Sequence, residues 1–314
     1  MDVLLVISAL LVAVAIGAND IANAIGTAVG ANVLSYRRAS LLAGLAVAVG
    51  ALFAGGRTIS TVGTGILDTT ALGAGVLSLA LFCAAATVAM ATYWRYPVST
   101  TQAVVGALAG TGLAAGLSVD ATMLRSIITV WTLLPVVSAF LSFLLFFAVK
   151  AVFLRLFRDR IFLYERVMSV LVVVSGIIVA LSLGANNIGN VVGVLDARSA
   201  LPLAPAVLLG AGCIALGAVF LSSRVVLTIG KSITTLDPLQ AFVVQVSASL
   251  ALALCTMLGI PVSLSQATVG SVIGVGLTRG RKAVNSRYVG SILGSWVATP
   301  AISFAAAYAL FFIS

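Results

Sequence analysis

A ten-residue stretch in the apolar N-terminal segment most constrains how this chain folds. Residues 17–26 read GANDIANAIG and lie about halfway along an apolar run. Asn19, Asp20 and Asn23 in this stretch are side chains that the interior of a bilayer disfavours unless they serve a function. Residues 184–193, which read GANNIGNVVG, repeat the stretch 167 positions later, with six of ten residues identical. The sequence therefore predicts a repeated polar motif inside a membrane.

Composition supports the membrane location. The 314 residues are 61% hydrophobic and 8% charged, whereas a soluble domain carries about 25% charged residues. Apolar runs near twenty residues predict helical spans, and hence an all-α polytopic membrane protein. The net charge of +9 does not indicate nucleic acid as a partner, because the basic residues lie in short loops between apolar runs.

The apolar runs divide the chain into two halves with five segments each. Residues 1–153 form the first membrane repeat, 154–162 a basic cytoplasmic linker, and 163–314 the second repeat. The first segment of each half is expected to break at its Gly-Ala-Asn motif, and re-entrant segments are expected as well. The expected segments are 3–34, 40–56, 71–92, 98–117 and 127–153, followed by 163–197, 201–221, 239–258, 262–277 and 288–313.

Two further motifs recur in the same order, which favours a duplication. PVSTTQA at residues 97–103 matches PVSLSQA at residues 261–267, at an offset of 164. The polar stretches between the second and third segments also match, at an offset of 167. Their shared residues are Arg57, Thr61 and Gly63 in the first half, and Arg224, Thr228 and Gly230 in the second.

An odd number of segments per half predicts that the two repeats enter the membrane in opposite orientations. If the loop at Arg37 is cytoplasmic, every lysine and arginine except Arg57, Arg125 and Arg198 falls on the cytoplasmic side. That bias is what the positive-inside rule requires. We therefore expect a multi-pass protein of the plasma membrane with both termini extracellular. Inverted repeats with interrupted helices indicate a secondary transporter whose site lies at the midplane.

The residue types of the first motif suggest chemistry at the expected break. Glycine permits a non-helical turn, and asparagine or aspartate caps the half-helix that follows. Backbone N–H groups freed at a helix N-terminus bind anions. The alternative is that Asn19 and Asn23 only join packed helices and that Asp20 only caps.

The second motif predicts two more helix starts. Pro97 and Pro261 suit the first position of a helix. Ser99 with Gln102, and Ser263 with Gln266, have capping-box spacing. Thr100, Thr101 and Ser265 add hydroxyl groups beyond what a cap requires. We expect the two starts to meet near the centre and to present a neutral shell of donors, which suits a tetrahedral oxyanion. The carboxylate of Asp20 would accept a proton from phosphate but would repel sulfate.

Other functions have less support. Histidine is absent, and Cys83, Cys213 and Cys255 are isolated in apolar runs, so neither an enzyme nor a metal or cofactor site is expected. A passive anion channel stays open as an alternative. Arg57 and Arg224 fit either interfacial snorkelling or an anion-attracting mouth.

These motifs resemble the inorganic phosphate transporter (PiT) family, which also contains bacterial sulfate permeases, and the resemblance covers nearly the whole chain. It implies cation-coupled import of phosphate by alternating access, with sulfate as the alternative substrate, and commonly a homodimer. It also implies that the coupling cation, H⁺ or Na⁺, is held by Asp20, Asn23, Asn187 and Asn190. The implied substrate-binding residues are Asn19, Asp20, Asn23, Ser99, Thr100, Thr101, Gln102, Asn186, Asn187, Asn190, Ser263, Ser265 and Gln266.

The chain departs from the family pattern at three expected carboxylates. Asn187 stands where the second signature has aspartate, and Ser60 and Leu227 stand where the polar stretches have glutamate. Fewer carboxylates leave less charge to balance a cation. The choice between Na⁺ and H⁺ therefore stays open at this stage.

Overall fold

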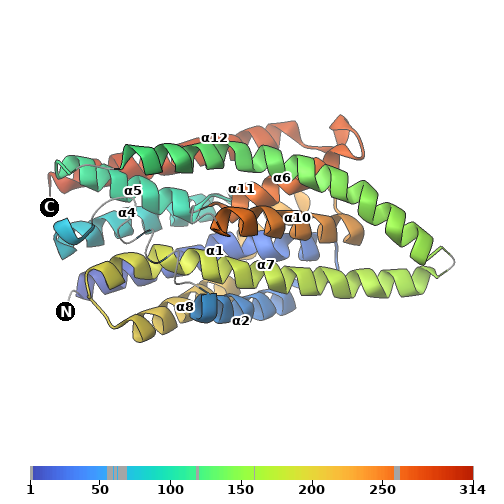
Figure 1. Ribbon diagram of the computed structural model, residues 1–314, viewed down its shortest axis with the longest axis horizontal. Coiled ribbons are helices and arrows are strands. Elements are labelled where there is room, and N and C mark those ends of the chain that lie inside the picture. Colours follow the sequence, from blue (N-terminus) through green and yellow to red (C-terminus); the bar gives the residue numbers. More distant parts are fainter. Residues whose placement is uncertain are drawn as a thin grey trace.

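The computed structural model describes residues 3–54, 59, 62, 69–117, 120–158, 160–257 and 262–313. Within these ranges the regular structure is helical (Figure 1). The first half contains α1 (Val3–Gly30), α2 (Tyr36–Ala54), η2 (Thr69–Ala71), α4 (Ala74–Tyr93), α5 (Thr100–Ala114) and α6 (Ala121–Leu156). The second contains α7 (Ile161–Ala197), α8 (Leu203–Phe220), α9 (Ser223–Lys231), α10 (Pro238–Met257), α11 (Leu264–Leu277), η3 (Arg281–Ala283) and α12 (Ser286–Phe311).

Seven of the described helices are long and apolar enough to cross a membrane, which confirms the predicted all-helical membrane protein. They are α1, α2, α4, α6, α7, α8 and α12. The longest, α6 and α7, have 36 and 37 residues. Large apolar side chains such as Phe140 and Val297 are exposed on the outer surface, where a bilayer would cover them.

The helix pairs α4–α5 and α10–α11 form two hairpins. Figure 1 shows α4 and α5 in the left part of the molecule and α10 and α11 in the right part. With 15 and 14 residues, α5 and α11 are shorter than the roughly 20 residues that a span requires. Of the five segments expected in each half, the segments that form α5 and α11 are therefore too short to be full spans. They agree instead with the expectation of re-entrant elements.

The expected breaks at the Gly-Ala-Asn motifs are also wrong. Both α1 and α7 continue as α-helix through residues 17–26 and 184–193. The glycines have another purpose, which is close helix packing. A Cβ atom on Gly17 would lie 2.0 Å from the carbonyl oxygen of Ile214 in α8, and one on Gly184 would lie 2.0 Å from that of Val47 in α2. Because the polar side chains find partners on neighbouring helices, the backbone has no need to unwind.

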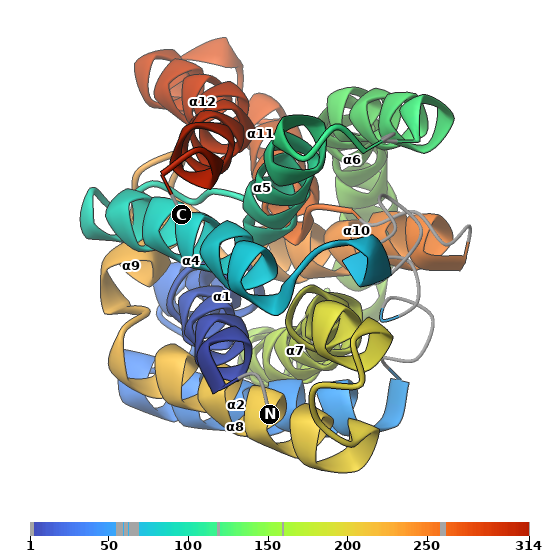
Figure 2. The same cartoon turned by 90° about the vertical axis from the view of Figure 1, so that its left-hand side faces the viewer.

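Close helix contacts recur at the offset of the repeat. A Cβ atom on Gly50 would lie 1.9 Å from the carbonyl oxygen of Leu181, and one on Gly217 would lie 2.2 Å from that of Val14. Thus α2 packs on α7 of the other half, and α8 packs on α1. Figure 2 shows α2 and α8 together in one layer beneath α1 and α7. The two halves are interleaved rather than lying as separate lobes.

Some sequence predictions fall outside the described residues. These are the positions Arg57, Thr61, Gly63 and Pro261. The second polar stretch is described and contains the nine-residue helix α9. The basic linker is shorter than predicted, because α6 continues to Leu156 and α7 begins at Ile161.

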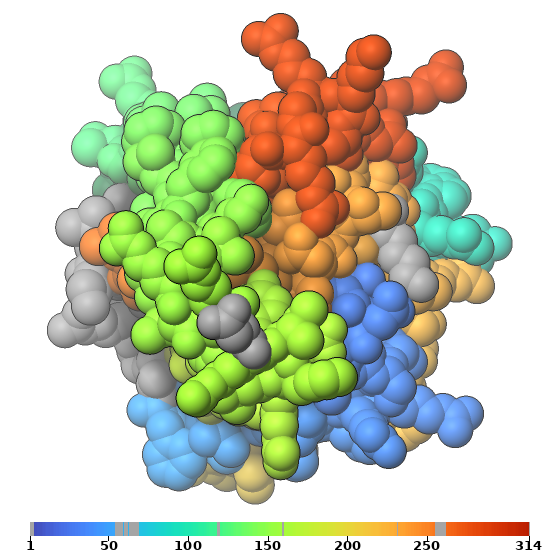
Figure 3. All heavy atoms as spheres, turned by 90° about the vertical axis from the view of Figure 1, so that its right-hand side faces the viewer, coloured from blue at the N-terminus to red at the C-terminus, as the bar shows by residue number. Residues whose placement is uncertain are grey.

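Both termini lie at one end of the molecule, and the α6–α7 turn lies at the other (Figure 1). Figure 3 views this second end, where the α6–α7 turn lies near the segment that leads into α12 and near the α1–α2 connection. Eight of the seventeen lysines and arginines of the chain lie in these connections or in the helix turns next to them, namely Arg37, Arg38, Arg155, Arg158, Arg160, Arg279, Arg281 and Lys282. We refer to this end as the basic end.

Candidate functional site

The tips of the two hairpins are fastened to the repeated motifs by equivalent asparagines. Asn19 in α1 donates from Nδ2 to the Thr92 hydroxyl (2.9 Å) and to the Tyr96 carbonyl (3.0 Å), and its Oδ1 accepts from the Val98 amide (3.0 Å). Asn186 in α7 donates from Nδ2 to the Val262 carbonyl (3.2 Å). The two asparagines therefore position the hairpins.

The starts of α5 and α11 meet at the centre, as predicted. Ser99 and Ser263 have extended backbone conformations, and their hydroxyl oxygens accept from the amides of Gln102 and Gln266, at 3.2 Å each. These are N-caps of the usual kind. The Ser265 hydroxyl donates to the Val98 carbonyl across the gap between the hairpins (2.7 Å). Two helix N-termini, with their positive dipole ends, are thus brought together inside the protein.

A polar cluster joins α1 to these helix starts. Asp20 accepts a short hydrogen bond from the Thr100 hydroxyl at the start of α5. Asn23 donates from Nδ2 to the Ser265 hydroxyl of α11 (2.8 Å) and to the backbone carbonyl of Asp20 (3.0 Å). All four side chains are buried. One helix of the first half therefore touches both hairpins.

The second motif contributes to the same cluster through Thr101. Asn190 in α7 donates from Nδ2 to the Thr101 hydroxyl and to Asn187 Oδ1, at 3.0 Å each. Thr101 in turn donates to Asn187 Oδ1 at 3.4 Å. Neighbouring hydroxyls on α5 thus face the two motifs, with Thr100 on Asp20 and Thr101 on Asn187.

Oxygen atoms in the cluster lack partners. Asp20 Oδ1 and Asn23 Oδ1 are buried and accept no hydrogen bond from any described residue. An unsatisfied buried polar atom costs about 1–3 kcal/mol, and more when charged. Asp20 is the one carboxylate that is buried among the described residues, and no described lysine or arginine is buried with it. Unpaired carboxylate and carbonyl oxygens are the ligands that hard cations prefer.

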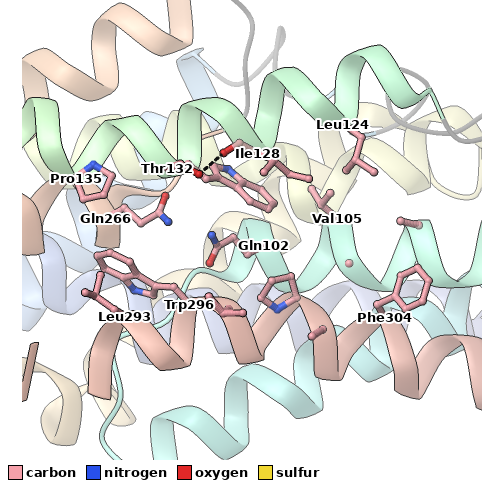
Figure 4. Close-up of a pocket in the computed structure, with 16 residues that line it drawn as sticks. Gln102, Val105, Leu124, Ile128, Thr132, Pro135, Gln266, Leu293, Trp296 and Phe304 are labelled. Atoms are coloured by element: carbon pink, nitrogen blue, oxygen red, sulfur yellow. Dashed lines mark hydrogen bonds between the residues drawn. The ribbon is translucent and has the colours of Figure 1, made fainter. Parts of the chain in front are cut away.

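The two predicted glutamines do not join this cluster. Gln102 and Gln266 are 2% and 3% exposed, and the Oε1 atom of each has no hydrogen-bond partner among the described residues. Figure 4 shows both side chains pointing into a cavity of about 540 Å³ between α5, α6 and α12. The reciprocal half of a capping box is therefore absent at these described positions, because the glutamines face the cavity instead of their caps.

Sequence reasoning missed the other residues that line this cavity. Trp131 and Pro135 in α6 correspond to Trp296 and Pro300 in α12, at an offset of 165, and all four line it. The shared Trp-x-x-x-Pro spacing in the last segment of each half was a signal that could have identified them. The Trp296 indole donates to the Pro97 carbonyl (3.3 Å) and so also supports the first hairpin tip.

Residues 16–307 match the model of the phosphate transporter family. The chain belongs to this family. It is a family of transporters, not of enzymes. A provisionally named phosphate permease of Methanocaldococcus jannaschii is 30% identical, with 92% of this chain and 89% of that protein covered.

Two more relatives extend the comparison. The sulfate permease CysP of Bacillus subtilis is 27% identical, with 99% of this chain and 87% of that protein covered. The solved structure titled "The sodium-dependent phosphate transporter" superposes with a TM-score of 0.89 at 26% identity, covering 99% of this chain and 98% of the other. Relatives of this transporter are thus named for either of two tetrahedral oxyanions.

Proposed function

We propose that this transporter imports inorganic phosphate together with a cation by alternating access. The observation that carries the proposal is the meeting of two uncharged helix starts beside a single buried carboxylate. Ser265 joins the two starts, and Thr100 joins one of them to Asp20. A binding site of neutral donors holds an anion without trapping it, since no fixed positive charge has to be left behind on release.

We propose that the anion binds where Gln102 and Gln266 face the cavity between α5, α6 and α12. The amide groups of these two side chains come from different halves and point toward one another (Figure 4). Each lies in the first turn of its helix, where backbone N–H groups and the helix dipole favour negative charge. Ser99 and Ser263 shape these turns as N-caps. Thr100, Thr101 and Ser265 stand next to the same helix starts.

We propose that the coupling cation binds next to the anion, at Asp20, Asn23, Asn187 and Asn190. Their carboxylate and amide oxygens are ligands of the type that Na⁺ takes, and Asp20 alone could carry H⁺. The unpaired Asp20 Oδ1 and Asn23 Oδ1 support a ligand role. The solved relative named for sodium dependence favours Na⁺ as the first cation to test.

Inverted repeats provide the framework for alternating access in this proposal. Paired contacts at matching offsets support them, as does the left-handed backbone shared by Asn32 (φ 57°) and Ser199 (φ 49°), 167 residues apart. The hairpins that lie toward opposite ends also support them. The domains in this view are residues 1–153 and 163–314. The positive-inside rule then assigns the basic end to the cytoplasm of a plasma membrane, with both termini extracellular. A homodimer is proposed on the family resemblance alone.

Phosphate is proposed ahead of sulfate because of Asp20. Near neutral pH phosphate carries a proton that a carboxylate can accept, whereas sulfate carries none and would be repelled. The likeness to CysP keeps sulfate as the second candidate. Uptake of labelled phosphate into proteoliposomes, in competition with unlabelled sulfate, distinguishes the two. If unlabelled sulfate inhibited phosphate uptake at concentrations equal to or below that of phosphate, the proposed preference for phosphate over sulfate would be wrong.

The two glutamines provide a direct test of the proposed anion site. Replacing both, as Gln102→Met with Gln266→Met, removes two donors to a charged ligand while keeping the side-chain size. We expect the KM for phosphate to rise about 100-fold or more, because hydrogen bonds to charged groups contribute about 1.5–3 kcal/mol each and two are lost. Initial rates of phosphate uptake measure the change.

Thr132→Val is the matched control for the glutamine pair. Thr132 lines the same cavity, but its hydroxyl donates to Ile128 of its own helix (2.9 Å). We expect its KM to stay within about twofold of wild type. A glutamine double variant that folds and keeps the wild-type KM would exclude these side chains from the anion site.

A further inference from the structure

A second cavity, of about 400 Å³, lies between the tip of the α4–α5 hairpin, α9 and the start of α12. Arg95, Arg224, Thr228 and Tyr288 are among the residues that line it. In Figure 3 the hairpin tip (turquoise) and α9 (light orange) are neighbours at the right-hand edge of the basic end. We call this cavity the vestibule.

One arginine of the vestibule is held in place by contacts that carry no negative charge, and no described acidic residue pairs with it. The Arg224 guanidinium lies 4.9 Å from the centre of the Tyr93 ring and donates from Nη1 to the Tyr93 carbonyl (3.3 Å). Neither contact neutralises the positive charge. By contrast, Arg279 at the same end of the molecule pairs with Asp237 at 2.5 Å.

The second arginine is positioned by the shape of the hairpin tip. Arg95 has a left-handed backbone (φ 67°), a conformation that costs a side-chain-bearing residue energy. Its carbonyl accepts from the Tyr288 hydroxyl (3.4 Å), which ties the tip to α12. None of the described residues that line the vestibule is acidic. The cavity therefore holds two positive charges with hydroxyl groups around them.

The vestibule is connected to the central site through one side chain. Tyr96 lines the vestibule, and its carbonyl accepts from Asn19 Nδ2 at 3.0 Å. The same asparagine accepts from Val98, the residue whose carbonyl meets Ser265. The hairpin tip is thus a shared wall between the two arginines and the helix starts.

We propose that the vestibule is a docking site for a tetrahedral oxyanion, with phosphate as the first candidate. The vestibule lies between the basic end and the central site. Arginine suits this ligand because its planar fork offers paired N–H donors to phosphate oxygens. Two uncompensated arginines also raise the local anion concentration and hence the rate of association. The inference rests on the proposed transport function, but it concerns a site of its own.

Tryptophan fluorescence tests the docking site directly. The chain has three tryptophans, and Trp94 lines the vestibule. The variant Trp131→Phe with Trp296→Phe leaves Trp94 as the sole reporter. In nanodiscs of neutral lipid, we expect a saturable change of Trp94 emission with inorganic phosphate, and its loss when Arg95→Gln and Arg224→Gln are added. Gln102→Met with Gln266→Met, which removes the side-chain donors of the proposed central anion site, should leave the response intact.

Two outcomes of the fluorescence experiment would overturn the docking site. One is a flat Trp94 response to phosphate. The other is a response to anionic lipid in the nanodisc but not to phosphate, which would assign the two arginines to lipid headgroups. In either case, intact phosphate uptake by the wild type would leave the proposed transport function standing.

Transport measured at varied ionic strength provides a second test. It uses protein that keeps all three tryptophans. For Arg95→Gln with Arg224→Gln we expect kcat/KM for phosphate to fall about tenfold at low salt, with the difference shrinking as salt screens the charges. Arg198→Gln is the control, because Arg198 bonds the Thr70 carbonyl away from the vestibule (2.9 Å). The proposal would be contradicted if Arg198→Gln lowered kcat/KM by as much as the double variant. It would also be contradicted if the effect of the double variant did not depend on salt.

Discussion

Asp20→Asn is expected to abolish concentrative uptake of phosphate, with initial rates at least about 100-fold below wild type. The substitution keeps the side-chain size but removes the one buried carboxylate of the described residues. The position matched to it holds Asn187, and the chain has no histidine, so no neighbouring group replaces the lost charge. Removing one partner of a buried charge pair costs about 3–5 kcal/mol, because the other charge is left uncompensated. Uptake of labelled phosphate into proteoliposomes measures the loss.

Asp196→Asn is the matched control for this prediction. Asp196 is a carboxylate near the end of α7, but it is exposed. We expect wild-type uptake and wild-type selectivity from this variant. The same experiment with labelled sulfate tests the selectivity argument, because Asp20→Asn should narrow the discrimination between the two anions. If Asp20→Asn kept both phosphate accumulation and its selectivity over sulfate, the roles given to this residue would be wrong.

Gly217→Ala is expected to destabilise the protein by more than about 3 kcal/mol, since added atoms in a packed core already cost 1–3 kcal/mol against flexible side chains. At Gly217 the atoms that a new side chain would meet belong to the backbone of α1, which cannot move aside as a flexible side chain can. The new Cβ atom would lie 2.2 Å from the Val14 carbonyl oxygen and 3.0 Å from the Ala18 amide nitrogen. Because α1 carries the polar cluster, separating α8 from α1 would also displace Asn19 and Asp20. Thermal unfolding of the detergent-solubilised protein measures the effect.

Gly212→Ala is the control in the same helix. A Cβ atom on Gly212 would have no described neighbour within 4 Å, and alanine favours a helix by about 1 kcal/mol over glycine. We expect this variant to unfold at or slightly above the wild-type temperature. Equal destabilisation of both variants would mean that helix flexibility, rather than the close crossing of α1 and α8, accounts for the glycine.

Composition and motif spacing were enough to predict the membrane class and the residues of the central cluster. The caps at Ser99 and Ser263 were predictable because capping depends on local spacing alone. The meeting of the helix starts was predicted from the motif that recurs at residues 97–103 and 261–267. These features depend on short-range chemistry or on a repeat that can be read along the chain.

The wrong predictions concern features that depend on contacts with residues distant in the sequence. Gly17 was interpreted as a helix break, although glycine also permits close packing, and only the neighbour Ile214 reveals which use applies. The orientation of Gln102 depended in the same way on a cavity bordered by α6 and α12. Re-entrant segments were expected, but the sequence did not identify which segments they are, because apolar character does not distinguish a helix that crosses the membrane from one that turns back.

The two motifs of the site resemble one another but differ in charge. Matching asparagines fasten the two hairpin tips, yet Asp20 on one motif corresponds to Asn187 on the other. Thr100 and Thr101 face this unequal pair from adjacent positions on α5. The framework thus offers two similar half-sites, of which one has a charge. Under the proposed coupling, this difference fits one cation rather than two.

The accumulation of phosphate against its gradient tests the central claim most directly. An anion entering a negative-inside compartment is opposed by about 2.3 kcal/mol per charge per 100 mV, so accumulation requires a coupled cation. Proteoliposomes are given a sodium gradient or a proton gradient, and each gradient is then dissipated. We predict phosphate accumulation above equilibrium under one of them and its collapse when that gradient is removed. Uptake that only equilibrates under every gradient would contradict coupled transport and indicate a passive anion channel.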